Sequence, residues 1–193
     1  MPSSDPVIVL AAGRGTRMGG PKALMDVAGE PWWRRQCSAL AEVTNTQIWV
    51  LSPDVRHSLT DPPAPIDIVE ADAHSPMFAS LTTGLQHLAA DPPSGVFVLP
   101  VDVPAATPTV WAALRDHPAP SIPTYNGHGG HPVRLPWSWV IERIDLTTPD
   151  PGGRLNLLLG EGAIRVPVDD DSVCQNLNRP EDLERWLTSE TRS

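Results

Sequence analysis

Short apolar runs, several of them rich in β-branched residues, alternate along the chain with segments of helical spacing. The first run is followed at once by glycine-rich sequence, which is typical of a strand buried on both faces. Such alternation predicts an α/β sandwich with a mainly parallel sheet. We expect its strands over residues 7–10, 47–51, 66–69, 96–99 and 163–168.

Four segments show the three-to-four-residue spacing of apolar side chains that amphipathic helices have. Pro31 suits the first position of the first helix, and Ser80 is a plausible N-cap of the second. Glu181 and Asp182 would lie at the positive end of the fourth helix, directly after Pro180. We expect these helices over residues 32–40, around 81–88, around 110–114 and over 180–187.

The proline- and glycine-rich stretch 118–136 interrupts this alternation. We expect a hairpin or loop excursion there, with strands near residues 121–125 and 132–135. No internal repeat and no linker between two cores is visible in the sequence. A chain of 193 residues is therefore expected to form one domain over residues 1–193.

Composition excludes several functional classes. The formal net charge is −9 and 40% of the residues are hydrophobic, so neither a disordered chain nor a nucleic-acid-coating protein is indicated. No apolar run approaches the roughly 20 residues that span a bilayer, and the first thirty residues do not resemble a signal peptide. We expect a soluble, cytoplasmic protein without nucleic-acid or membrane partners. Cys37 and Cys174 are expected to be buried thiols, not a disulfide or a zinc site.

The loop after the first strand carries the strongest functional signal. In open α/β sheets, ligands bind outside the carboxyl ends of the strands. Residues 10–24 place four glycines and the cations Arg14, Arg17 and Lys22 at such a position. This combination predicts an anion site, most plausibly for a polyphosphate, with a flexible basic loop as the alternative. The segment matches neither the P-loop nor the Rossmann glycine pattern.

The run LAAGRGTRMGGPKAL resembles the signature of the MobA-like nucleotidyltransferases, which include the molybdopterin guanylyl- and cytidylyltransferases. Further matches follow in the same order at residues 77–85, 98–104, 127–135 and 176–183. The resemblance implies a Rossmann-like three-layer α/β/α sandwich in a single domain. It also implies transfer of a nucleoside monophosphate from an NTP to an acceptor phosphate, with Mg²⁺ as cofactor and release of pyrophosphate.

The resemblance assigns the nucleotide to the first loop. The backbone of Leu10, Ala11 and Ala12 would line the base and ribose side. Gly13, Arg14 and Gly15 would lie near the phosphates, while Arg17 and Lys22 would hold the triphosphate as catalytic cations. Asp72 and Ser80 fall where relatives recognise the base. For Lys22 the alternative is an ordinary surface lysine, and for Ser80 it is a helix cap.

Asp102 ends the apolar run VFVLPV, so its carboxylate should lie at the carboxyl end of a central strand. Magnesium prefers hard oxygen ligands, and we expect Asp102 to be a catalytic metal ligand. The alternative is that it caps the following turn. By resemblance Asn176 would be a second metal ligand, although both Asn176 and Asn178 could instead bond turn backbone before Pro180.

The resemblance places the acceptor beside the segment GHGGHP, with Gly130 allowing close approach and His131 contacting a phosphate or orienting the loop. The spacing of His128 and His131 could suggest zinc, but no Cys, Asp or Glu lies near in sequence to complete a site.

Molybdopterin or a similar phosphorylated metabolite is the expected acceptor. The sequence does not decide whether the nucleotide is CTP or GTP, because LAAG favours the cytidylyl branch and NLNRPEDL favours the guanylyl branch. The alternatives are a sugar-phosphate nucleotidyltransferase and a non-catalytic protein that hands a cofactor to its target enzyme. Transient contact with a molybdoenzyme is implied at the family level only.

Overall fold

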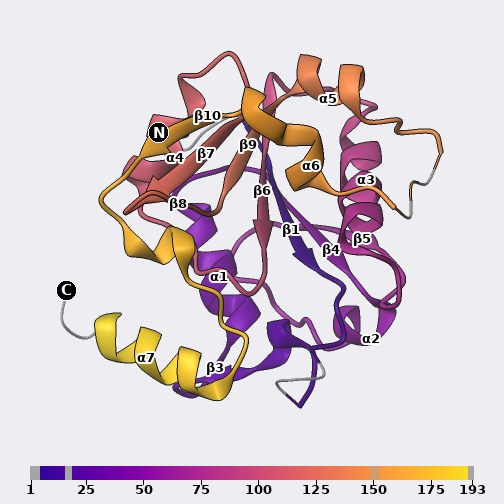
Figure 1. The fold of residues 1–193 in the computed structure, drawn as a ribbon. Helices are drawn as coiled ribbons and strands as arrows, with labels where there is room; N and C mark the ends of the chain where they lie inside the picture. The colour runs from indigo at the N-terminus through magenta and orange to yellow at the C-terminus, as the bar shows by residue number, and fades with distance from the viewer. Residues whose placement is uncertain (1–4, 16–18, 149, 151, 191–193) are drawn as a thin grey trace.

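A computed structural model describes the whole chain except residues 1–4, 16–18, 149, 151 and 191–193 (Figure 1). Its main sheet has the strand order β10-β7-β9-β6-β1-β4-β5, with β8 paired to β7. Most neighbouring pairs are parallel, but β9 runs antiparallel to both β6 and β7. The strands are β1 (Val7–Ala11), β4 (Gln47–Leu51), β5 (Asp67–Glu70), β6 (Gly95–Pro100), β7 (Ser121–Tyr125), β8 (His128–Gly129), β9 (Val133–Pro136) and β10 (Ile164–Pro167).

Helices cover both faces of this sheet (Figure 1). One face carries α1 (Trp32–Ala41), α2 (Pro53–Arg56), α4 (Pro108–Arg115) and α7 (Pro180–Glu190), which contribute to the larger hydrophobic cluster. The other face carries α3 (Met77–Leu88), α5 (Trp137–Arg143) and α6 (Leu155–Leu159), which contribute to the second cluster. The predicted α/β/α sandwich with a mainly parallel sheet is therefore confirmed. The remaining elements are the pair β2 (Asp26–Val27) and β3 (Glu30–Pro31) and three 3₁₀ turns, η2 (Lys22–Leu24), η3 (Gly160–Gly162) and η4 (Asp171–Cys174).

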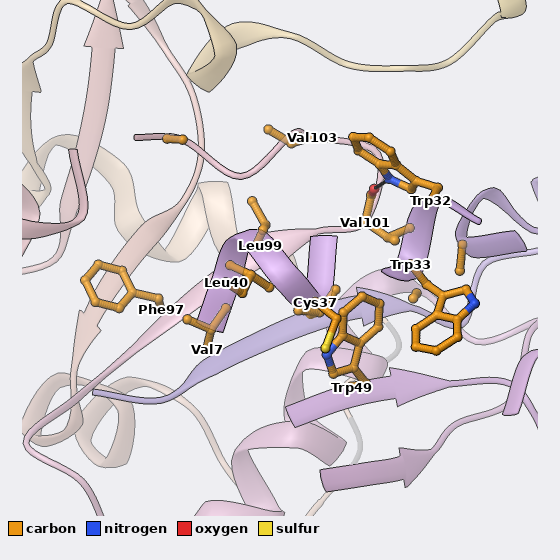
Figure 2. Close-up of a cluster of buried hydrophobic side chains, with 14 of the residues drawn as sticks. Val7, Trp32, Trp33, Cys37, Leu40, Trp49, Phe97, Leu99, Val101 and Val103 are labelled. Atoms are coloured by element: carbon orange, nitrogen blue, oxygen red, sulfur yellow. Dashed lines mark hydrogen bonds between the residues drawn. The ribbon is translucent and has the colours of Figure 1, made fainter. Parts of the chain in front are cut away.

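The central strands are buried because successive side chains enter opposite clusters. In β1, Val7 and Val9 belong to the larger cluster, whereas Ile8 and Leu10 belong to the second. Figure 2 shows part of the larger cluster, in which Trp32, Trp33 and Cys37 of α1 gather with Trp49 of β4. Trp32, Trp33 and Trp49 thus help to fill the layer between α1 and the sheet.

Two local predictions were wrong. Helix α3 begins at Met77 with Pro76 as its N-cap, so Ser80 lies inside the helix and does not cap it. Proline has no amide hydrogen and its fixed φ suits this entry, which places the helix start four residues earlier than the leucine spacing indicated. Cys37 is buried as expected, but Cys174 is only half-buried. Both cysteines are free thiols.

No described helix has the length and apolar character that crossing a bilayer requires.

Candidate active site

A cavity of about 380 Å³ opens at the carboxyl ends of β1 and β6. Several residues predicted to bind nucleotide line it, namely Leu10, Ala12, Gly13, Gly15, Lys22, Ser80 and Asp102. Arg17 lies outside the described residues, and Arg14 is exposed on the loop. The structure therefore brings the loop after β1 and the end of β6 to one concave surface.

The turn at Gly15 requires glycine. Gly15 has a φ of +57°, and the backbone amide of Gly20 donates a 3.3 Å hydrogen bond to its carbonyl oxygen. A Cβ atom at position 15 would lie 2.0 Å from the carbonyl oxygen of Gly20, which is too close for a rigid backbone to accommodate. The glycine thus allows the loop to fold back on itself before Lys22.

Lys22 lies at the start of η2 and connects three segments of the chain. Its Nζ donates to Oδ2 of Asp102 at 2.7 Å and to Oδ1 of Asn178 at 2.6 Å. The side chain of Lys22 is 17% exposed and that of Asp102 is 22% exposed. Lys22 is the one lysine in the 193-residue sequence. Its ammonium group is therefore directed into the cavity and not into bulk solvent.

The backbone around Asp102 is fixed from three directions. The indole Nε1 of Trp32 donates to the carbonyl oxygen of Val101 at 2.5 Å (Figure 2). The amide of Leu177 donates to the carbonyl oxygen of Asp102 at 2.8 Å, and Nε2 of Gln36 donates to that of Val103 at 2.7 Å. Because three consecutive carbonyls are bonded in this way, the carboxylate of Asp102 is held in place by buried groups of α1 and by the chain before α7.

The oxygen atoms of Asp102 and Asn178 are suited to a divalent cation. Both converge on one cationic group, the Lys22 ammonium, and hard oxygen ligands combined with substrate phosphates are the ligand set that Mg²⁺ prefers. Among the described residues there is no cluster of three or more His, Cys, Asp or Glu that could hold a metal ion by itself. The site would therefore depend on ligand phosphates to complete its coordination.

Not every predicted site residue reaches this cavity. Asn176 is exposed, and its Nδ2 donates to the carbonyl oxygen of Cys174 at 3.4 Å. Asp72 is also exposed, and its carboxylate accepts a hydrogen bond from the backbone amide of His74. The sequence did not single out Asn178, although it lies in the same N-L-N segment as Asn176. Which asparagine faces Lys22 depends on how the segment before α7 folds, and spacing alone does not show this.

A second cavity, of about 830 Å³, adjoins the first and shares Leu10, Met77 and Pro100 with it. Gly130 and His131, the predicted acceptor residues, both line this second cavity. A Cβ atom on Gly130 would lie 1.9 Å from the carbonyl oxygen of Val173, so the close approach expected at this glycine is to backbone.

The backbone amide of His131 donates to that same Val173 oxygen at 2.8 Å. Burial lowers the pKa of His131 from its ordinary value, and the negative charge of Asp102 opposes this shift only in part. The imidazole is therefore biased towards its neutral form in the folded protein.

The sheet with helices on both faces and the glycine-rich loop after its first strand place the first cavity at the edge where open α/β sheets bind their ligands. A sequence profile described as "MobA-like NTP transferase domain" matches residues 7–158. The chain therefore belongs to the MobA-like NTP transferase family of nucleotidyltransferases.

Individual proteins show the same relationship. The chain is 29% identical over 186 residues to the molybdenum cofactor guanylyltransferase of Serratia proteamaculans, covering 93% of this chain and 92% of that protein. Among solved structures, the Mycobacterium sp. strain JC1 homologue of Mycobacterium tuberculosis Rv0371c is 23% identical, with a TM-score of 0.76 over 100% of this chain and 99% of that one. Rv0371c of Mycobacterium tuberculosis itself, solved in complex with manganese, is 20% identical, with a TM-score of 0.72. That match covers 97% of this chain and 100% of Rv0371c. These two structures support the fold.

Proposed function

We propose that this protein is a magnesium-dependent nucleotidyltransferase that transfers a nucleoside monophosphate to a phosphorylated acceptor of the molybdopterin type. One observation carries the proposal: the Lys22 ammonium is bonded to both Asp102 and Asn178 in a cavity that continues into a second, larger cavity. The first cavity offers cationic and backbone groups for a triphosphate. The second has room for an acceptor beside it.

The proposed reaction needs no covalent intermediate on the protein. An oxygen of the acceptor phosphate attacks the α-phosphorus of the NTP, and the bond from that phosphorus to the bridging oxygen of the β-phosphate breaks. Pyrophosphate leaves, and a new P–O–P linkage joins the nucleoside monophosphate to the acceptor. Such transfers depend on positioning and on neutralising charge, which Lys22, Arg14 and Arg17 would provide for the triphosphate.

Asp102 and Asn178 are the residues that we propose hold the metal. The ligand role predicted for Asn176, two positions earlier, would require its exposed side chain to turn towards the cavity. A bound Mg²⁺ would supply positive charge to the phosphate oxygens, which lowers the cost of charge developing in the transition state. The hydrogen bonds from Trp32 and Gln36 to the adjoining backbone would keep the Asp102 carboxylate oriented for this role.

GTP is the first nucleotide to test, because the curated relative that matches nearly the whole chain is named a guanylyltransferase. The sequence also favours CTP at the start of the first loop, so both nucleotides belong in the experiment. Pyrophosphate release is measured with CTP, GTP, ATP or UTP, each with Mg²⁺, and with molybdopterin or a panel of sugar phosphates. We expect turnover with molybdopterin and with either GTP or CTP. Nucleotide binding without turnover on any acceptor would favour the non-catalytic alternative.

Two variants test the roles of the site. Asp102→Asn should lower turnover by about 100-fold or more while leaving the fold intact, since it removes the one carboxylate bonded to Lys22. Asp91→Asn, at an exposed position after α3, is the matched control and should retain full activity. Undiminished turnover in Asp102→Asn would remove Asp102 from the metal site.

The single lysine allows a direct binding measurement. Reductive methylation with ¹³C-formaldehyde labels Nζ of Lys22 and the α-amino group, and it keeps the positive charge of the lysine. Lys22→Arg, labelled in the same way, identifies the Lys22 methyl signal by its loss. We expect NTP with Mg²⁺ to shift this signal. An unchanged signal under saturating NTP would place the triphosphate elsewhere.

A further inference from the structure

Two arginines that line the second cavity have no side-chain partner among the described residues. Arg154, at the start of α6, and Arg165, on β10, both line it. Neither guanidinium forms an ion pair or a hydrogen bond with the described part of the chain. No acidic residue occurs among the described residues that line the cavity. In a chain with a net charge of −9, this cavity is a local exception, because its charged lining residues are all cationic.

Arg165 lies far from the site of the proposed reaction. It is the register partner of Ile122 on β7, and both line the cavity, so the two side chains share the face that carries α3, α5 and α6. The sheet order places β10 three strands away from β6, the strand that precedes Asp102. Three interstrand spacings of about 4.8 Å separate them by about 14 Å. Lys22 lines only the first cavity and Arg165 only the second.

Much of the wall of the second cavity is apolar. Val98, Val133 and Ile122 come from three neighbouring strands, and Phe78, Leu81 and Leu159 come from the helices above them. Gly129 leaves space for the side chain of Arg165, because a Cβ atom on Gly129 would lie only 3.0 Å from Nη1 of Arg165. The cavity therefore has an apolar wall over three strands, with Arg165 on the edge strand β10, Arg154 at the start of α6 and the Lys22 cavity adjoining it.

We propose that Arg165 and Arg154, which both line the second cavity, bind anionic or electron-rich groups of the acceptor other than the phosphate that reacts. This inference rests on the proposed function for the location of the reacting phosphate. It defines the acceptor class as a molecule with an apolar, ring-sized body, a phosphate that reacts and strong hydrogen-bond acceptors besides it. Arginine suits this task because its guanidinium remains charged and can bond a planar anionic group through two N–H donors.

A matched pair of fluorescent probes tests the two arginines without any turnover. The anion 8-anilinonaphthalene-1-sulfonate and the neutral N-phenyl-1-naphthylamine share a ring system and differ in the sulfonate. We expect the wild-type protein to bind the anionic probe more tightly. Arg165→Gln and Arg154→Gln should each weaken binding of the anionic probe by about tenfold, the usual scale for a hydrogen bond to a charged group, and leave binding of the neutral probe unchanged.

Arg185→Gln, an exposed arginine on α7, is the control variant and should bind both probes as the wild type does. Equal affinity of the two probes for the wild-type protein would overturn the proposal, as would unchanged binding in the double variant Arg154→Gln/Arg165→Gln. If Lys22→Gln no longer binds the anionic probe and the double variant binds it fully, the sulfonate lies in the first cavity. That result would also overturn the proposal.

The outcome can be separated from that of the proposed function. If no NTP gives turnover but the arginine variants bind the anionic probe more weakly and the neutral probe as before, the anion site exists and the proposed reaction is wrong. If turnover is observed and the double variant keeps the wild-type KM for the acceptor, the reaction is right and the arginines do not bind the acceptor.

Discussion

Gln36 on α1 donates a hydrogen bond of 2.7 Å to the carbonyl oxygen of Val103, one residue beyond Asp102. Its Oε1 also accepts a hydrogen bond from the amide of Ala105 at 2.9 Å. Gln36 is buried, at 2% exposure, so both backbone groups depend on it and not on water. A core residue 67 positions away from Val103 in sequence thus helps to determine where the carboxylate segment lies.

Gln36→Leu should destabilise the protein and impair the site together. The substitution leaves a buried carbonyl and amide without partners, which costs about 1–3 kcal/mol in free energy of unfolding. Turnover at saturating Mg²⁺ should fall as well, because the segment carrying Asp102 loses its anchor. Urea denaturation and pyrophosphate release measure the two effects. Gln86→Leu, on the exposed face of α3, is the control; equal behaviour of the two variants would show that Gln36 has no special role.

Gly130→Ala should disrupt the acceptor side of the site. The added methyl group would meet the carbonyl oxygen of Val173, and relief requires the loop to move away from η4. We expect a loss of about 1–3 kcal/mol in the free energy of unfolding, the usual cost of overpacking. Gly162→Ala is the matched control, because a Cβ there has no neighbour within 4 Å. Unaltered urea midpoints for both variants would contradict the packing seen here.

The buried pair of Asp5 and Arg134 gives a third prediction. Nε of Arg134 donates to Oδ2 of Asp5 at 2.9 Å, and both side chains are less than 10% exposed. Arg134→Met should cost about 3–5 kcal/mol, because it removes the positive charge that Arg134 holds beside a buried carboxylate. Arg143→Met, on the exposed surface of α5, should change stability by no more than about 0.5 kcal/mol. The double variant Asp5→Leu/Arg134→Met should recover part of the loss; if it does not, charge burial is not the cause.

His131 should make the protein less stable at mildly acidic pH. Its pKa in the folded state lies below that in the unfolded chain, since burial disfavours the charged imidazole. Between the two pKa values the unfolded state binds more protons, so stability falls as the pH drops through about 6.5 and below. Between pH 7.5 and 5.5 the urea midpoint of the wild type should therefore fall further than that of His131→Asn. His74→Asn, at an exposed position, should follow the wild type.

Local sequence patterns predicted the parts of the structure that local interactions determine. The loop after β1 could be located because its glycines and cations are contiguous, and Asp102 because it directly follows an apolar strand. The strands of the main sheet also fall near the expected residues, since β-branched apolar runs are a strong signal for buried strands.

The features that were missed depend on contacts between distant segments. Asn178 meets Lys22 across 156 positions, and Gln36 meets Val103 across 67. The start of α3 was misplaced because leucine spacing marks a buried face and not a helix end. Arg165 stood in a predicted strand, but only the register with β7 shows that it lines a cavity. Such long-range relationships appear only once the strand order is known.

The two cavities draw on different stretches of the chain. Described residues from 122 to 165 contribute to the second cavity and not to the first. Under the proposed function, substitutions across that stretch would alter which acceptor is bound and leave the residues around the triphosphate untouched. Acceptor choice and nucleotide chemistry would then diverge separately, and one ancestral enzyme would give rise to relatives that use the same nucleotide on different metabolites.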